Sequence, residues 1–190
     1  HVQKTWGDAD FTNSLSGGSG NGVVTFNSSD ESVATIDANG EVTLVGGGSA
    51  IISAVKAEDA LYLEASASFT ITVNRAAQAA LSFAETSIAK TWGDASFTNT
   101  LSGGSGGGGV TYTSSNPDIL TVGAFGEIAI VGVGSATISA VKAADDRYLE
   151  ASATYSVAVV KAAQAPLEFD ASSVARVWND SAFTNGVSGG

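Results

Sequence analysis

The chain has 190 residues, 44% of them hydrophobic, and its 19 acidic and 8 basic residues give a net charge of -11. Such a surface repels phosphate backbones and anionic lipid headgroups, which argues against nucleic acid or a bilayer as a partner. No apolar run approaches the ~20 residues that span a membrane, and the absence of cysteine excludes disulfides and thiolate metal sites.

The sequence repeats itself with a period of 86 residues. The text "KTWGDADFTNSLSGG" begins at Lys4, and closely similar text begins at Lys90 and again at Arg176. The register holds from end to end without an insertion, which predicts tandem copies of one structural unit. A unit of this length falls within the size range of a self-standing domain, so each copy should have its own core.

Module boundaries are expected at "NRAAQAAL" and "VKAAQAPL", where the alternation typical of strands lapses. This division predicts a first module at residues 1–77 that lacks its first strand, a complete second module at 78–163, and the opening strands of a third at 164–190. Because the chain contains no methionine, we expect it to be a processed or excised piece of a longer protein.

Within a copy, hydrophobic residues alternate with serine and threonine. In "ASASFTITVN", the inner face is predicted to hold Ala67, Phe69, Ile71 and Val73. Strict alternation with a polar outer face indicates antiparallel strands with one solvated face. For the second copy we predict strands at residues 81–89, 97–102, 110–114, 120–122, 127–131, 136–142 and 153–160.

Seven short strands at roughly ten-residue spacing, joined by glycine-rich turns, predict an all-β sandwich. The turn "DANGEV" has Asn-Gly at its centre, which is the strongest short hairpin signal. Aromatic residues recur at equivalent positions of every available copy, so we expect them in the cores. These sets are Trp6/Trp92/Trp178, Phe11/Phe97/Phe183, Phe26/Tyr112, Tyr62/Tyr148, Phe69/Tyr155 and Phe83/Phe169.

The segment "SSDESVATIDANGEVTLVGGGSAIISAV", residues 28–55, resembles the central signature of bacterial immunoglobulin-like domains of group 2. Modules of that family occur in intimin- and invasin-like proteins and in very large repetitive surface adhesins. The second copy departs from the pattern with "ILTVGAFGEIAIVGVGSATISAV" but keeps Gly126, Gly134 and Ile138. The resemblance implies tandem immunoglobulin-like antiparallel β-sandwiches in an extracellular, cell-surface protein.

The C-terminal partial copy has two interpretations. It is either a slice through a longer array, cut without regard to module edges, or a strand donor that completes the first module of another copy. Strand addition to an open edge is an established recognition mode, and head-to-tail contacts that do not close build filaments. The candidate donor residues are Leu167, Phe169, Val174 and Trp178.

The sequence offers few residues for metal binding or catalysis. Asp8, Asp94 and Asp180 align between copies and are weak calcium candidates, although a turn stabilised by a side-chain hydrogen bond would also repeat an aspartate. The one histidine is His1, and without cysteine no nucleophilic triad of the usual kind is available. We therefore expect no enzyme and no cofactor.

The function expected from the sequence is mechanical: a stalk or filament segment of a bacterial extracellular repeat adhesin, whose partners are neighbouring modules or further copies of the chain. The alternative is a carbohydrate- or protein-binding module that uses the loop at 102–109 and Phe125. Phe125 occupies a predicted hairpin tip where the first copy has Asn39, which makes it the candidate for an exposed binding contact.

Overall fold

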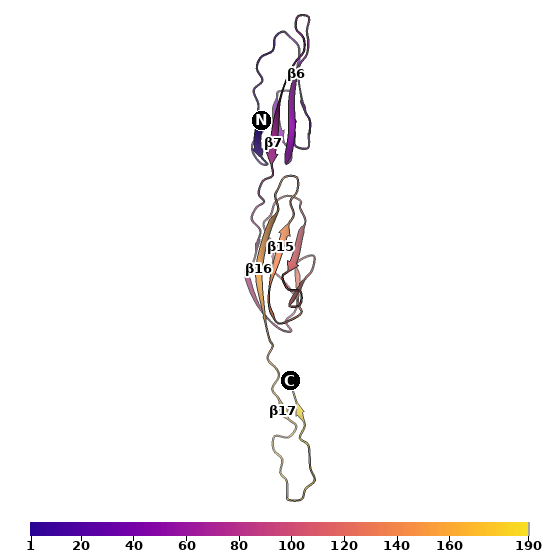
Figure 1. Ribbon diagram of the computed structural model, residues 1–190. Coiled ribbons are helices and arrows are strands. Elements are labelled where there is room, and N and C mark those ends of the chain that lie inside the picture. Colours follow the sequence, from indigo (N-terminus) through magenta and orange to yellow (C-terminus); the bar gives the residue numbers. More distant parts are fainter. Residues whose placement is uncertain (190) are drawn as a thin grey trace.

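The computed structural model describes residues 1–189, which form strands and turns. Figure 1 shows two β-sandwiches arranged end to end, followed by an extended C-terminal segment, so the whole molecule is elongated. No helix in the described part of the chain is long and apolar enough to cross a membrane. The all-β prediction is confirmed.

The first sandwich consists of a four-stranded sheet facing a three-stranded sheet. The four-stranded sheet has the order β1-β7-β6-β3, and the three-stranded sheet has the order β2-β5-β4. The strands are β1 (Val2–Thr5), β2 (Phe11–Thr12), β3 (Val24–Ser28), β4 (Ala34–Ile36), β5 (Glu41–Leu44), β6 (Gly48–Lys56) and β7 (Ala65–Asn74).

The second sandwich has the same two sheets and, in addition, a two-stranded sheet. Its sheets have the orders β9-β16-β15-β12 and β10-β14-β13, and β8 pairs with β11. The strands are β8 (Ser82–Phe83), β9 (Ser87–Thr91), β10 (Phe97–Thr98), β11 (Leu101–Ser102), β12 (Val110–Ser114), β13 (Leu120–Val122), β14 (Glu127–Ile130), β15 (Gly134–Lys142) and β16 (Ala151–Val160). Beyond it, β17 (Glu168–Phe169) pairs with β18 (Val187–Ser188).

The long strands hold each sandwich together. β6 and β7 pair antiparallel over nine residues, as do β15 and β16. One pair in each four-stranded sheet is parallel, β1 with β7 and β9 with β16, so the prediction of purely antiparallel sheets is wrong at that edge. In the second sandwich the parallel pair arises because the chain enters β9 from β8, which belongs to a different sheet, and no hairpin joins β9 to β16.

Two predicted strands are each divided in the structure. Residues 81–89 form β8 and β9 in different sheets, because Phe83 and Ile88 both pack on the core. Residues five apart in a continuous strand would face opposite sides, so the chain must break between them. The predicted strand at 97–102 is likewise split into β10 and β11, with Asn99 between them.

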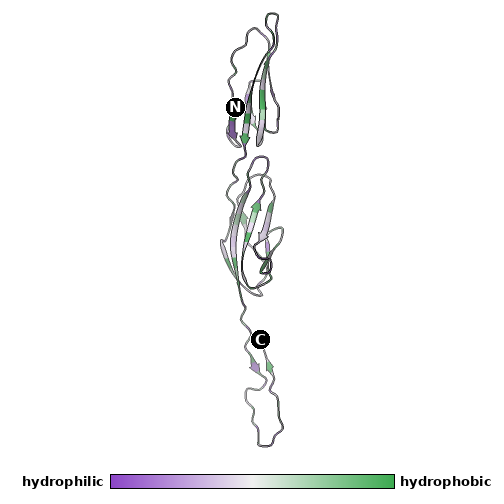
Figure 2. Ribbon diagram, in the orientation of Figure 1, coloured by the Kyte–Doolittle hydropathy of each residue, from purple (hydrophilic) through white to green (hydrophobic). Residues whose placement is uncertain are grey.

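Each sandwich has its own hydrophobic core, and the apolar colouring of Figure 2 follows the long strands. The first core contains Val33, Ala34, Val42, Leu44, Ala50, Ile52, Ile71 and Val73. The second core contains Phe83, Leu120, Ile128, Ala136, Ile138, Ala140, Tyr155, Val157 and Val159. Burial of one large aliphatic side chain stabilises a fold by about 1.5–3 kcal/mol, so these clusters account for much of the stability.

The core prediction for the aromatic residues is confirmed only in part. Phe83 and Tyr155 are buried, whereas Trp92, Tyr62 and Trp178 are exposed. The predicted inner face of β7 is also incomplete, because Ile71 and Val73 are buried but Phe69 is half-buried and Ala67 is exposed. The repeated positions therefore include surface contacts as well as core.

We predict that Ile52→Ala destabilises the first sandwich by about 2–5 kcal/mol, because Ile52 is 1% exposed and its truncation leaves a cavity. Urea unfolding followed by circular dichroism measures the loss. Ile51→Ala is the matched control: its side chain is 51% exposed on the other face of the same strand, and its cost should stay within about 0.5 kcal/mol. Equal losses from both variants would contradict the assigned register.

Candidate functional site

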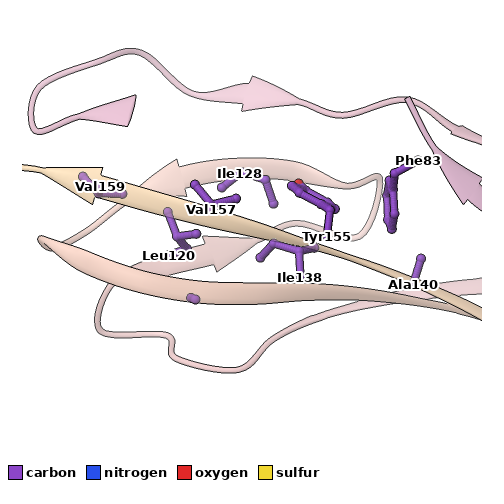
Figure 3. Close-up of a cluster of buried hydrophobic side chains, with 9 residues drawn as sticks. Phe83, Leu120, Ile128, Ile138, Ala140, Tyr155, Val157 and Val159 are labelled. Atoms are coloured by element: carbon purple, nitrogen blue, oxygen red, sulfur yellow. The ribbon is translucent and has the colours of Figure 1, made fainter. Parts of the chain in front are cut away.

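In the second sandwich, β8 closes one end of the core. Phe83 is 8% exposed and packs edge-to-face on Tyr155, with ring centroids 4.5 Å apart (Figure 3). Such an aromatic pair contributes about 0.5–1.5 kcal/mol beyond its buried area. Tyr155 is only 3% exposed as a result, and burial raises the pKa of its hydroxyl to about 12.

Hydrogen bonds fix β8 in this position. β8 pairs with β11 through Phe83–Leu101 and Ser82–Ser102. Asn99, which is buried, donates its side-chain amide to the Glu85 carbonyl at 2.7 Å and accepts from the Glu85 backbone N–H at 3.1 Å. The side chain of Asn99 thus replaces the ladder bonds that are lost where the chain leaves β8.

The same end of the first sandwich is open. The counterpart of Phe83 would lie before His1, and a cavity of about 130 Å³ lies there. Its lining includes Leu15, Phe26, Ile36, Ile52, Ala54, Ala67 and Phe69. We call this cavity the acceptor groove.

Equivalent residues differ in burial between the two sandwiches because of the groove. Phe69 is half-buried where Tyr155 is buried, and Asn13 is exposed where Asn99 is buried. Leu15 is exposed, whereas Leu101 is partly covered by its pairing with β8. The acceptor groove therefore lies where β8 packs in the second sandwich.

The C-terminal segment, residues 164–189, carries a strand of that kind. β17 is the counterpart of β8 and pairs with β18 over two residues. The amide of Asn185 bonds both backbone groups of Ala171, at 2.8 and 3.0 Å, as Asn99 bonds Glu85. Leu167 and Phe169 are exposed, so their apolar surface is available for contact.

Val174 and Trp178, the other two candidate donor residues, are also exposed. Their counterparts in the first sandwich are Val2, which lies on β1, and Trp6, which follows β1. The positions that Val174 and Trp178 would take in that sandwich are thus already filled. Leu167 and Phe169 have no counterpart in the first sandwich among the described residues, and all four candidate donor residues stay a prediction.

A second feature is the joint between the sandwiches, where the loop at 143–150 meets the end of the first sandwich. The Arg147 guanidinium lies 4.5 Å from the ring centroid of Trp6, and its Nε–H donates to the Val45 carbonyl at 3.0 Å. The Gly47 N–H donates to the Asp146 carbonyl at 2.6 Å. These contacts join the two sandwiches directly.

The linker between the sandwiches, residues 75–81, makes hydrogen bonds of its own to the second sandwich. The Ala76 N–H donates to the Arg147 carbonyl at 2.9 Å, and the Leu149 N–H donates to the Ala76 carbonyl at 2.8 Å. The Gln78 side-chain amide donates to the carbonyls of Ala143 and Leu149 at 3.1 and 2.7 Å, and its oxygen accepts from the Ser105 N–H at 3.0 Å. A linker with so many bonded groups behaves as part of the second sandwich.

Asp145 stiffens the loop at 143–150. Its carboxylate accepts from the backbone N–H groups of Arg147, Gly107 and Tyr148 at 2.9, 2.7 and 2.8 Å. These bonds, that of Arg147 above all, lower the pKa of Asp145 below the usual 3.8. Asp59 makes the same bonds in the first sandwich, to Leu61, Asn21 and Tyr62, and its pKa is lowered for the same reason.

The repeated "KTWGD" motif holds a tight turn in each copy. The Asp8 carboxylate accepts from the Thr5 N–H at 2.8 Å, and the Lys4 ammonium lies 4.8 Å from the Phe11 ring centroid. The equivalent contacts are Asp94–Thr91, Lys90–Phe97, Asp180–Val177 and Arg176–Phe183. All three calcium candidates thus cap turns, and residues 1–189 contain no group of three or more metal-ligating side chains.

Phe125 lies at the tip of the hairpin between β13 and β14 and is 94% exposed. The loop at 102–109, named with it as a candidate binding surface, closes over the second sandwich: Gly107 and Ser105 donate their backbone N–H groups to Asp145 and Gln78. That loop therefore serves the joint. Phe125 as a ligand contact stays a prediction.

The family model of the intimin immunoglobulin-like domain matches residues 9–58 and 94–145, which together make up more than half of the chain. The chain belongs to this family. The predicted resemblance to the immunoglobulin-like modules of intimin-like adhesins is confirmed, and the chain is an adhesin-type module pair. No curated protein matches the sequence.

Solved structures of low sequence identity also match. Mouse protocadherin-24 EC1-3 is 14% identical, with 98% of this chain and 71% of that chain covered and a TM-score of 0.42. Drosophila N-cadherin EC1-4 is 14% identical over 85% of this chain and 47% of that chain, with a TM-score of 0.42. The S-layer protein rSbsC(31-844) is 21% identical over 78% of this chain and 21% of that chain, with a TM-score of 0.37. The family assignment rests on the matched sequence stretches.

Sequence reasoning missed the joint. The signal was a break in the repeat, because Arg147 aligns with Leu61 although the residues around it, Asp145, Tyr148 and Leu149, align with Asp59, Tyr62 and Leu63. The repeated pair Gln78 and Gln164 was a second signal. A polar residue repeated within an apolar linker indicates a bonded role for its side chain.

We predict that Asp145→Asn lowers stability at neutral pH and flattens its acid dependence. Because the folded-state pKa of Asp145 is lowered, its contribution is fully present above the unfolded value of 3.8 and is lost as pH falls through the folded value. Urea unfolding at pH 7 and about pH 3 measures both effects. The neighbouring Asp146→Asn serves as control, because it removes one carboxylate from the same loop without breaking the hydrogen bonds that Asp145 accepts. An unchanged profile for Asp145→Asn would contradict the assignment.

Proposed function

We propose that this chain is a stiff spacer segment of a bacterial cell-surface adhesin, and that copies of it join head to tail through the C-terminal strand segment. The observation that carries the assembly proposal is the difference between the two sandwiches. Phe83 closes the second core, whereas the acceptor groove leaves the first one open. A stalk built this way holds a distal binding region away from the cell.

The spacer role is supported by the joint. Stiffness requires that neighbouring modules keep one relative orientation. Most domains joined in one chain move relative to each other unless specific contacts hold them. Here the linker bonds to the second sandwich through Ala76 and Gln78, while Arg147 and Asp146 reach back to the first sandwich. Loss of one contact at the joint should therefore let the two sandwiches reorient relative to each other without unfolding either of them.

We predict that Gln78→Ala leaves both sandwiches folded but lets them reorient. Removal of the side chain leaves the linker without its hydrogen bonds to Lys142, Ala143, Leu149 and Ser105. Small-angle X-ray scattering should show a broader distribution of distances, and NMR relaxation should give the two sandwiches separate correlation times. At a concentration where the chain is monomeric, Gln164→Ala removes the counterpart side chain outside the joint and should leave both readouts unchanged. A Gln78→Ala rod as stiff as the wild type would remove the linker from the proposed mechanism.

The assembly role is supported by matched partners on both ends of the chain. If Phe169 of one copy took the place of Phe83, its strand would lie beside Leu15 and Ser16 of the other. The partners of Gln78 also have counterparts there, Ala57, Leu63 and Ser19, so Gln164 could make the same bonds. The two-residue pairing of β17 with β18 is the contact that would be exchanged.

We predict that Phe169→Asp abolishes the self-association of the chain, because a carboxylate cannot enter an apolar groove unpaired. Sedimentation velocity over a concentration series measures the mass. Phe125→Asp is the control, since Phe125 is also exposed but belongs to neither the C-terminal segment nor the acceptor groove. A wild-type chain that stays monomeric throughout, or a Phe169→Asp chain that associates normally, would contradict strand insertion.

A cysteine pair tests the register of the same insertion. Ser82 and Ser102 lie directly opposite, with their hydroxyl oxygens 3.0 Å apart, and their counterparts are Glu168 and Ser16. The chain has no cysteine of its own, so Ser16→Cys/Glu168→Cys should form covalent multimers under oxidation. Ser16→Cys/Ser181→Cys is the matched control, and equal cross-linking by both would argue against this register.

A further inference from the structure

The joint between the two sandwiches of one chain, called the inner joint from here on, covers a defined surface on each sandwich. On the first sandwich it lies over Trp6 and Val45, both of which are partly buried. On the second sandwich the covering element is the loop at 143–150, which presents Arg147 and Leu149. A second contact of the same geometry, made by the outer ends of the two sandwiches, would use the residues at equivalent positions of the repeat.

Those counterparts lie at the two outer ends of the paired sandwiches, and both sets are exposed. At the N-terminal end, the loop at 57–64 presents Leu61 and Leu63, which are 85% and 86% exposed. At the far end of the second sandwich, Trp92, Val131 and Val133 are exposed. We call the first surface the leucine loop and the second the tryptophan face.

The leucine loop has the same shape as the loop that forms the inner joint. The Asp59 carboxylate accepts from the N–H groups of Leu61 and Tyr62 at 2.9 and 3.0 Å, as Asp145 does from Arg147 and Tyr148. Leu61 is therefore held where Arg147 stands in the other loop. A preformed loop loses little conformational entropy on binding.

The two loops differ at three positions, Glu58/Ala144, Ala60/Asp146 and Leu61/Arg147, and the faces differ at Gly47/Val133. Two of these differences make the outer surfaces more apolar at the points of contact. The loop position that holds Arg147 in the inner joint holds Leu61 in the leucine loop, and the face position of Gly47 holds Val133. A Cβ at Gly47 would lie 2.9 Å from the Asp146 carbonyl oxygen, so a valine there makes the loop sit slightly farther out. Both changes replace a polar or close backbone contact with an apolar one.

We infer that the leucine loop and the tryptophan face are two halves of one apolar joint, in which the leucine loop of one copy of this chain packs on the tryptophan face of a second copy. The inference deepens the proposed head-to-tail assembly and rests on it. Leu61 covers Trp92 as Arg147 covers Trp6, and Val133 fills the space opened by the outward shift. Two joints thus alternate along the assembly, one polar and hydrogen-bonded within a chain, and one apolar between chains.

The apolar pairing is selective. Leu61 cannot donate to the Val45 carbonyl or stack as a cation on Trp6, so the leucine loop would lose both contacts on the face of the inner joint. The loop of the inner joint would in turn bring Asp146 against Val133, where a bare glycine is needed for close approach. Each loop therefore suits its own face, which fixes the order of modules in the assembly.

A mixing experiment on the full chain tests the contact. Leu61→Lys and Val133→Asp each place a charge in the apolar joint, and each alone should weaken self-association at least about tenfold in Kd, as for a residue near the centre of an interface. An equimolar mixture should recover association, because the Val133→Asp copy still presents an unmodified leucine loop to the unmodified tryptophan face of the Leu61→Lys copy. At the next interface along the assembly, the introduced ammonium meets the introduced carboxylate. Sedimentation velocity reports all three samples, with Phe125→Asp as the exposed-residue control.

A tandem fusion separates this inference from strand insertion. Residues 1–172 are joined directly to a second full chain, which preserves the register because Ser173 is the counterpart of His1 two periods on. The fusion places the tryptophan face of the first chain against the leucine loop of the second. Val133→Asp in the first chain and Leu61→Lys in the second should each lower the urea midpoint, and together they should restore part of the loss.

The outcomes decide the two proposals independently. Additive losses in the fusion, or a mixture that associates no better than its components, would overturn the apolar joint. Phe169→Asp in the first chain of the fusion probes the acceptor groove alone; if it changes nothing while the charge pair is coupled, the groove proposal fails and the joint stands. If Phe169→Asp lowers stability while Val133→Asp and Leu61→Lys show no coupling, the apolar joint fails and the groove proposal stands.

Discussion

The rest of the structure depends on one packing constraint, which is that a two-sheet sandwich of this kind leaves one end of its core uncovered unless a further strand closes it. In the second sandwich that strand is β8, and Phe83 completes the cluster around Tyr155. β8 follows directly on the linker from the first sandwich, so the core of one module is finished by residues that connect it to its neighbour. A domain of about this length buries little more than ~60% of its unfolded surface, which makes the loss of one aromatic residue a large fraction of its stability.

The same stretch of chain that closes the core also sets the angle between modules. Gln78 bonds the loop at 143–150 and the loop around Ser105, only five residues before Phe83. Because β8 is fixed in the second sandwich and Ala76 is bonded to it, little free chain is left to bend. Core completion and stiffness are therefore coupled: a force that pulled the modules apart would have to disturb hydrogen bonds next to a buried strand.

Much of this could be predicted from the sequence, and the exceptions have physical causes. Period-two alternation located the strands at 110–114 and 120–122 without error, because a half-buried strand leaves that pattern. It failed at 81–89, where Phe83 and Ile88 serve the same core from different sheets. Counting the strands of the repeat led us to expect a first module without its first strand. The joint could not be expected in this way, because Arg147 and Trp6 are brought together by tertiary structure and no local pattern reports a contact over that separation.

The differences between the copies indicate which surfaces the fold leaves free to vary. Core positions exchange within narrow limits, such as Phe69 with Tyr155, since packing density tolerates little change in volume. At the ends of the sandwiches the exchanges alter chemistry outright, from Arg147 to Leu61 and from Val133 to Gly47. Variation that spares the cores and alters the surfaces where modules meet is consistent with the proposed end-to-end assembly.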